Sequence, residues 1–211
     1  MVDLQRLYDA ILKGDARTAA AVTQEALEAR VSPLDIISKY MIPAMDRVGR
    51  MFECEEYYVP ELLLAARAMK AALEPLRPLL AAAGNQGAGK VVIGTVRGDL
   101  HDIGKNLVAS LLEGGGFQVV DLGADVAPEK FIEVVNATGA GIVALSALLT
   151  TTMPGMKSTV DAFKQAGVRG KVKIMIGGAP VTSQFAAKIG ADGYAENASQ
   201  AVTLARKLAA C

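Results

Sequence analysis

The sequence predicts an α/β protein in two parts: an N-terminal bundle of four helices, then a parallel sheet of five strands with helices between them. Two observations predict this fold. Residues before the glycine-rich stretch 83–90 show only helical apolar spacing, whereas residues after it alternate short β-branched runs with amphipathic stretches. The stretch itself, with Gly84, Gly87 and Gly89, is expected to be a flexible connection. We therefore expect domains at residues 1–88 and 89–211.

Apolar spacing and helix start signals place the four N-terminal helices. The expected ranges are residues 4–12, 16–29, 33–52 and 60–80. Asp15 is a candidate N-cap for the second helix, and the third begins at a proline directly after Ser32. Pro75 and Pro78 are expected to kink or shorten the last helix, because proline has no backbone N–H. Short loops between the helices favour a small bundle.

The second part alternates strands and helices. The expected strands are residues 91–96, 118–122, 141–146, 172–177 and 193–195. Apolar spacing predicts a helix over 103–113 after the first strand, and a final helix over about 198–209. Right-handed crossovers between parallel strands then give a doubly wound sheet, which places ligands at the carboxyl ends of its strands.

Composition excludes several classes of function. The 211 residues include 22 Lys and Arg against 22 Asp and Glu, so no bulk positive charge favours a nucleic-acid or anionic-membrane partner. Cys54 and Cys211 are too few for a disulfide framework, which favours a reducing cytoplasm. The first residues lack the pattern of a signal peptide, and no apolar stretch reaches bilayer length. We expect a soluble intracellular protein.

The only histidine, His101, lies just past the first strand of the sheet. Asp99, two residues earlier, is close enough to accept a hydrogen bond from one imidazole nitrogen, which leaves the other nitrogen for a metal. Gly104 allows a bulky ligand to approach the backbone. The simpler alternative is a histidine that caps the following helix or lies on the surface.

The segment Asp99-Leu-His101-Asp102-Ile103-Gly104 resembles the Asp-x-His-x-x-Gly signature of cobalamin-binding domains. That family continues with Ser-x-Leu and then Gly-Gly. Here 41 residues separate Gly104 from the Ser-x-Leu segment, and a further 28 precede the Gly-Gly pair. The matching residues are Ser146, Leu148, Gly177 and Gly178. Three elements in order, each at a predicted strand end, make the resemblance specific.

The resemblance implies a flavodoxin-like strand order and a bound cobalamin or related corrinoid in its base-off, His-on form. His101 would be the cobalt ligand, and the motif residues Asp99, Asp102, Ile103 and Gly104 would contact the cofactor. Ser146 and Thr150 would donate hydroxyls to the nucleotide tail or to the Asp99 carboxylate, and Leu148 would line the site. Gly177 and Gly178 would keep the slot for the tail open. Ordinary strand-end turns are the alternative for these glycines.

Two N-terminal segments, residues 45–52 and 57–69, resemble the helical cap that precedes the cobalamin domain in methionine synthase. They also resemble the cap of small corrinoid proteins of methylamine, methanol and methoxyaromatic metabolism. In that family the bundle covers the upper corrin face. The residues at the corresponding positions are Tyr58, Val59 and Leu62. Packing in the bundle interior is the alternative role for each, because apolar residues at helical spacing usually form a core.

The resemblance implies a corrinoid carrier, with His101 and Asp99 tuning the cobalt. A substrate:corrinoid methyltransferase would load a methyl group onto cobalt. A second methyltransferase, with tetrahydrofolate or coenzyme M as acceptor, would remove it, and a reductive activase is a further partner. The chain has no room for a substrate-binding barrel, so it would not be a complete enzyme alone.

Two other classes of cobalamin-binding protein have the same Asp-x-His-x-x-Gly loop. A subunit of an adenosylcobalamin mutase resembles the second part of the chain but typically lacks the helical cap. A cobalamin-dependent sensor or regulator would need a DNA-binding module, and no such module or basic patch is apparent. A nucleotide-binding Rossmann protein is disfavoured because the first loop has no Gly-x-Gly-x-x-Gly. The methyl donor is not determined by the sequence.

Overall fold

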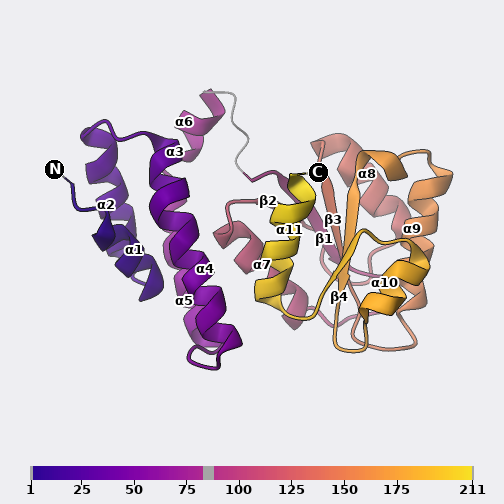
Figure 1. The fold of residues 1–211 in the computed structure, drawn as a ribbon. Helices are drawn as coiled ribbons and strands as arrows, with labels where there is room; N and C mark the ends of the chain where they lie inside the picture. Colours follow the sequence, from indigo (N-terminus) through magenta and orange to yellow (C-terminus); the bar gives the residue numbers. More distant parts are fainter. Residues whose placement is uncertain (1, 83–87, 211) are drawn as a thin grey trace. The chain divides into compact units, whose positions relative to one another are not determined.

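The computed structural model describes residues 2–82 and 88–210, and it divides the chain into two compact units (Figure 1). The first unit comprises residues 1–87 with 113–116, and the second comprises residues 88–112 with 117–211. The predicted flexible connection, including Gly84 and Gly87, lies almost entirely outside the described residues, as does Cys211. The predicted domain boundary at residues 88 and 89 stays a prediction.

The first unit is helical, as predicted. Its elements are α1 (Gln5–Leu12), α2 (Ala16–Glu28), α3 (Pro33–Ile36), a π-helical turn η1 (Ile37–Met41), α4 (Ile42–Glu53), α5 (Val59–Leu73) and α6 (Arg77–Ala82). Helix α2 packs against α1 and α5, and α1 also packs against α4. Asp15 is the N-cap of α2, as predicted: its Oδ1 atom accepts a hydrogen bond of 3.0 Å from the Thr18 amide.

Two predicted helices of this unit are interrupted at prolines. The predicted helix 33–52 contains a π turn directly before Pro43, where the Ile42 amide donates to the Ile37 carbonyl. A proline ring at this position collides with the carbonyl four residues earlier in a regular helix, so a wider turn relieves the crowding. The predicted helix 60–80 ends at Leu73, and α6 begins after Pro75. The expected effect of the prolines on the last helix is thereby confirmed.

The second unit contains a parallel sheet in the order β2-β1-β3-β4-β5, which confirms the flavodoxin-like arrangement. The strands are β1 (Lys90–Thr95), β2 (Gln118–Asp121), β3 (Ile142–Ser146), β4 (Lys173–Gly177) and β5 (Gly193–Ala195). Chain order reverses between β1 and β3, the switch point at which open α/β sheets bind ligands. Thr95, Ser146 and Gly177 pair across the three central strands, so these strands end at the same level.

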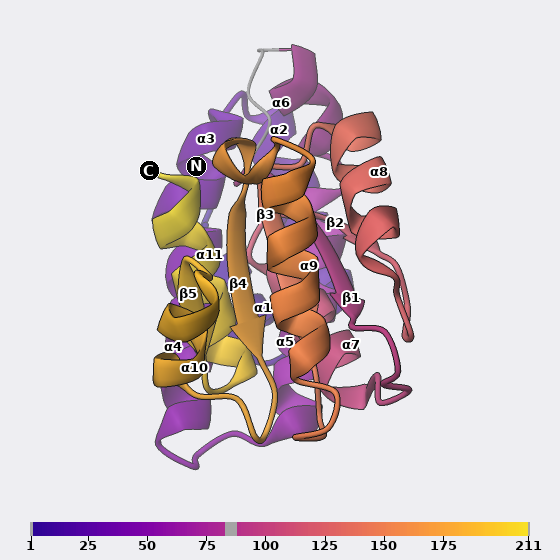
Figure 2. The same cartoon turned by 90° about the vertical axis from the view of Figure 1, so that its right-hand side faces the viewer.

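Helices cover both faces of the sheet (Figure 2). They are α7 (Ile103–Gly114), α8 (Pro128–Thr138), α9 (Pro154–Gln165), a 3-10 turn η2 (Arg169–Lys171), α10 (Ser183–Ile189) and α11 (Ala198–Ala209). Alternate residues of β1 enter two separate cores. Val92 packs in one core with Phe131 of α8, whereas Val91 packs in the other with Leu112 of α7 and Leu208 of α11. In residues 2–82 and 88–210, no helix is both long and apolar enough to cross a membrane.

Gly94 of β1 provides a test of this packing. A Cβ atom at position 94 would lie 2.7 Å from the Cζ atom of Phe131, whose side chain is fully buried. We expect Gly94→Ala to lower the free energy of unfolding by about 1–3 kcal/mol, because the ring has no space to move. Denaturant unfolding measures this. The double variant Gly94→Ala/Phe131→Leu should lose less stability than the sum of the two single variants; strict additivity would contradict the proposed collision.

Candidate functional site

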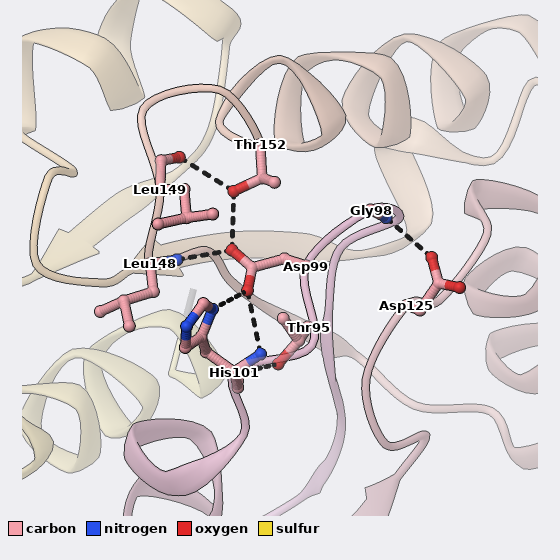
Figure 3. Close-up of polar contacts among 8 residues, drawn as sticks. All are labelled: Thr95, Gly98, Asp99, His101, Asp125, Leu148, Leu149 and Thr152. Atoms are coloured by element: carbon pink, nitrogen blue, oxygen red, sulfur yellow. Dashed lines mark hydrogen bonds and ion pairs between the residues drawn. The ribbon is translucent and has the colours of Figure 1, made fainter.

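The loop between β1 and α7 carries the Asp99–His101 pair predicted from the sequence (Figure 3). The Nδ1 atom of His101 lies 2.8 Å from Oδ1 of Asp99, and the His101 amide donates to the same oxygen at 3.0 Å. The predicted hydrogen bond between the imidazole and the carboxylate is therefore confirmed. Thr95 at the end of β1 is fully buried and donates its hydroxyl to the His101 carbonyl at 2.9 Å, which fixes the backbone of the loop.

The Asp99 carboxylate is fully buried and receives hydrogen bonds on both oxygens. Its Oδ2 atom accepts from the Leu148 amide at 2.7 Å and from the Thr152 hydroxyl at 2.6 Å. Burial raises the pKa of Asp99, but the hydrogen bonds from Thr152, Leu148 and His101 outweigh burial and hold this pKa well below its usual range. The carboxylate is ionised and can only accept, so the shared proton resides on Nδ1 of His101.

The outer face of His101 remains open. Its side chain is 51% exposed, and in the neutral ring with its proton on Nδ1 the Nε2 atom has a free lone pair. Four apolar side chains in the segments around Asp99 and His101 are exposed: Leu100, Ile103, Leu148 and Leu149. A Cβ atom placed on Gly104 would meet nothing within 4 Å. One free imidazole nitrogen amid exposed leucines and an open glycine fits a flat, largely apolar macrocycle that brings its own metal.

The hydroxyl partner of Asp99 is Thr152, a residue that was not predicted from the sequence. Ser146 and Thr150 were the expected hydroxyl donors to the carboxylate or to a nucleotide tail, whereas the hydroxyl that bonds Asp99 is that of Thr152. The chain turns between Leu149 and Thr152, where the Thr152 amide donates to the Leu149 carbonyl at 3.0 Å, and this turn brings the third threonine of the run 150–152 onto Asp99. The three consecutive threonines at 150–152, shortly before Pro154, were the sequence signal for a hydroxyl donor at this turn. Contact of Ser146 and Thr150 with a nucleotide tail stays a prediction.

The two glycines after β4 differ in their environment. Gly177 pairs with Ser146 in the sheet, and a Cβ on it would lie 3.1 Å from the Ala195 carbonyl oxygen. Gly178 has φ +136°, and its Cβ would lie 1.9 Å from the Ala147 carbonyl oxygen. Backbone proximity to the β3–α9 loop therefore already requires glycine at position 178. The role of both glycines in keeping a slot open stays a prediction.

The three residues expected to contact the upper corrin face differ in their exposure to solvent. Tyr58 and Val59, at the start of α5, are exposed, whereas Leu62 is 1% exposed and offers no surface to a ligand. The alternative role of Leu62, packing in the protein interior, agrees with this burial. Tyr58 also begins the helix, since its amide donates to Oε2 of Glu61 at 2.9 Å. Contact of Tyr58 and Val59 with a cofactor stays a prediction.

Thr152 is open to a direct test. We expect Thr152→Val to lower the free energy of unfolding by about 1–3 kcal/mol, because a buried carboxylate loses a hydrogen-bond donor with little change in volume. Thr152→Ser keeps the hydroxyl and is the matched control. Urea unfolding of the three proteins without cofactor measures the difference. Equal stability of the valine and serine variants would show that the hydrogen bond to Asp99 has little weight.

The fold and the pair together define a class of protein: a doubly wound domain that presents one oriented, half-exposed imidazole at its switch point. Family comparison agrees with this class. Two models, each described as a B12 binding domain, match residues 89–203 and residues 3–77. The chain belongs to the B12-binding family.

Three known proteins are similar to the chain over nearly its whole length. The dimethylamine corrinoid protein of Methanosarcina barkeri is 44% identical over 209 residues, which cover 98% of this chain and 97% of that protein. Trimethylamine corrinoid protein 2 of Methanosarcina mazei is 46% identical over 201 residues, covering 94% and 92%. A chain of the methanol:cobalamin methyltransferase complex of Methanosarcina barkeri has a TM-score of 0.82 at 31% identity, covering 98% of this chain and 79% of its own.

Proposed function

We propose that this chain is a corrinoid carrier protein: it takes a methyl group from a substrate:corrinoid methyltransferase and delivers it to a second methyltransferase. The corrinoid supplies the reaction centre, because its cobalt can accept a methyl group and release it again. Among the residues of the chain, His101 would hold the cobalt through Nε2. The Asp99–His101 hydrogen bond, with Nε2 left free beside exposed leucines, is the observation that supports this role.

The chain's contribution to the chemistry is to orient one imidazole and to hold one proton. Asp99 keeps the proton of the neutral ring on Nδ1 of His101 and fixes the ring plane, so Nε2 is the nitrogen left to bind a metal. Thr152 and the Leu148 amide hold the carboxylate in turn, so the acceptor that orients His101 is itself fixed by buried hydrogen bonds. A ring oriented in this way would hold the corrinoid's cobalt, and the corrinoid would supply the methyl-transfer chemistry.

A methylamine is the proposed methyl donor. The identities of 44% and 46% to the dimethylamine and trimethylamine proteins exceed the 31% to the chain from the methanol complex. The match of a second B12 binding domain model to residues 3–77 supports the carrier over a mutase subunit, which typically lacks such a helical part. The proposed acceptor is tetrahydrofolate or coenzyme M.

The proposed setting is a reducing cytoplasm, with a reductive activase as an additional partner. Cobalt must be kept at low potential for this chemistry, and the exposed free thiol of Cys54 is compatible with such a compartment. Separation of cell fractions, followed by detection of the protein, tests the location. Recovery in an oxidising extracytoplasmic fraction would contradict this part of the proposal.

Reconstitution tests the proposed function. We expect the purified protein, incubated with hydroxocobalamin and passed over gel filtration, to retain about one corrinoid per chain, as expected for a single ligand loop. The loaded protein should then accept methyl groups from dimethylamine or trimethylamine with the cognate methyltransferase at least about tenfold faster than from methanol with its own, a difference of about 1.4 kcal/mol in barrier. Absence of retained corrinoid would overturn the proposal. Faster transfer from methanol would overturn the choice of donor.

A further inference from the structure

The loop between β2 and α8, residues 122–127, touches the loop that carries Asp99 and His101, although it contains none of the signature residues (Figure 3). Asp125 makes two hydrogen bonds with that loop. Its Oδ1 atom accepts a hydrogen bond of 2.7 Å from the Gly98 amide, and its own amide donates to the Asp99 carbonyl at 3.0 Å. One residue therefore holds two consecutive residues of the loop that carries the histidine.

The backbone of Asp125 indicates a specific fit. Asp125 has φ +55°, in the left-handed region, where non-glycine residues are uncommon and aspartate is among the few tolerated. Gly98 is also left-handed, with φ +84°. Two left-handed positions, of which only Asp125 is unusual for its residue type, are thus joined by a hydrogen bond from backbone to carboxylate. Strained positions that surrounding contacts maintain occur preferentially at functional sites.

The two flanks of the 122–127 loop are attached to the same strand and helix that frame the histidine. After Asp125, the Val126 amide donates to the Thr95 carbonyl at 2.9 Å. Before it, the carboxylate of Asp121 pairs with the buried ammonium group of Lys105 in α7 and accepts from the Gly123 amide at 2.8 Å. Asp125 is therefore held by contacts on both sides along the chain, so its hydrogen bonds can fix the backbone position of Asp99.

We propose that Asp125 is a positioning residue for the cobalt ligand. Asp125 holds the backbone of Gly98 and Asp99 in the position from which the Asp99 carboxylate reaches Nδ1 of His101. It thereby favours the tautomer of His101 that leaves Nε2 free. Thr152 and Leu148 act on the carboxylate itself, whereas Asp125 acts on the backbone that carries it. The importance of this tautomer for cobalt rests on the proposed function; the effect of Asp125 on His101 does not.

The chain offers an unusually direct measurement, because His101 is its only histidine. Nitrogen-15 NMR of histidine-labelled protein without corrinoid, recorded where the ring is neutral, reports the fraction of each tautomer from one pair of signals. We expect the wild-type ring to carry its proton on Nδ1. In Asp125→Ala, the Nε2–H tautomer should become a substantial fraction, and the Gly98 amide should exchange with solvent about tenfold faster through loss of one hydrogen bond.

Three further variants separate positioning from general stability. Asp125→Asn keeps an acceptor for the Gly98 amide and tolerates positive φ, so it should restore the wild-type tautomer. Asp125→Gly accommodates the turn without the carboxylate; it should behave like Asp125→Ala and decides the test if the alanine variant does not fold. Glu129→Gln removes an exposed charge in the first turn of α8 and should leave His101 unchanged.

The result that would overturn the proposal is a wild-type tautomer ratio in Asp125→Gly, or in a folded Asp125→Ala. This holds even if the melting temperature has fallen, because a purely structural role predicts a stability change alone. Failure of the proposed function would be seen separately, as loss of corrinoid from the wild-type protein on gel filtration, since the NMR measurement contains no corrinoid.

Discussion

Replacement of His101 by alanine will leave the corrinoid bound while reducing methyl transfer by about 100-fold or more, since changes to groups that merely support a metal ligand already cost about 10–100-fold. A corrinoid makes many contacts across its ring and tail, whereas the axial bond is a single interaction that tunes the metal. Retention after gel filtration, the absorption spectrum and single-turnover methyl transfer measure the two effects. We expect the affinity for corrinoid to fall by less than the transfer rate.

Asp99→Asn is the matched comparison for His101→Ala. The amide can still meet the imidazole, but it no longer carries the negative charge that balances a positive ring, so the loss in transfer should be smaller than in His101→Ala. Asp99 is fully buried with four hydrogen bonds, and the variant should also lose some stability. A larger transfer defect in Asp99→Asn, in fully folded protein, would contradict His101 as the cobalt ligand.

Gly178→Ala will be the most destabilising single-methyl change tested. Its Cβ would lie 1.9 Å from the Ala147 carbonyl oxygen, and φ at this position is +136°, so the steric collision and the backbone strain both oppose alanine. We expect a loss of about 3 kcal/mol or more in the free energy of unfolding. The backbone at Ala147 must move, and Leu148, whose amide holds Asp99, follows it. Corrinoid retention should therefore fall as well.

Gly141→Ala is the control for this effect. Gly141 directly precedes β3, has no neighbour within 4 Å of its Cβ position and does not have a left-handed backbone. Its replacement should change stability by less than about 1 kcal/mol, because it affects only the entropy of the unfolded chain. Denaturant unfolding of the two variants and the parent protein makes the comparison. Similar stability of both variants would mean that the chain between β4 and α10 relaxes at little cost.

The sheet was predictable because its signals are local and repeated. Continuous β-branched runs such as 91–93 predict strands covered on both faces, and the structure sends alternate residues of β1 into two cores. The strand order required more than periodicity and came from the resemblance carried by His101 and its neighbours. In the helical unit, Asp15 and Pro75 are short-range signals, and both predictions held.

Features that depend on the path of the chain were not predictable from the sequence. Three threonines follow Leu149, and only the turn at 149–152 decides that Thr152 bonds Asp99. The π turn before Pro43 depends on hydrogen-bond register within a helix whose apolar pattern looks continuous. Leu62 lies four residues after Tyr58, so the helical spacing does not distinguish them. Only the packing of the folded protein shows that Tyr58 is exposed and Leu62 is buried. Asp125 had no sequence signal, because its partners are backbone groups of another loop.

The central claim, that His101 binds cobalt through its free ring nitrogen, has one direct measurement. The protein is labelled with nitrogen-15 at histidine, loaded with cob(II)alamin and examined by electron paramagnetic resonance. Because the chain contains a single histidine, its ring is the only labelled group that can bind the metal. Coordination by His101 predicts that the superhyperfine triplets of the unlabelled sample become doublets on labelling. Triplets that persist unchanged, as the cofactor's own base would give, would contradict the claim.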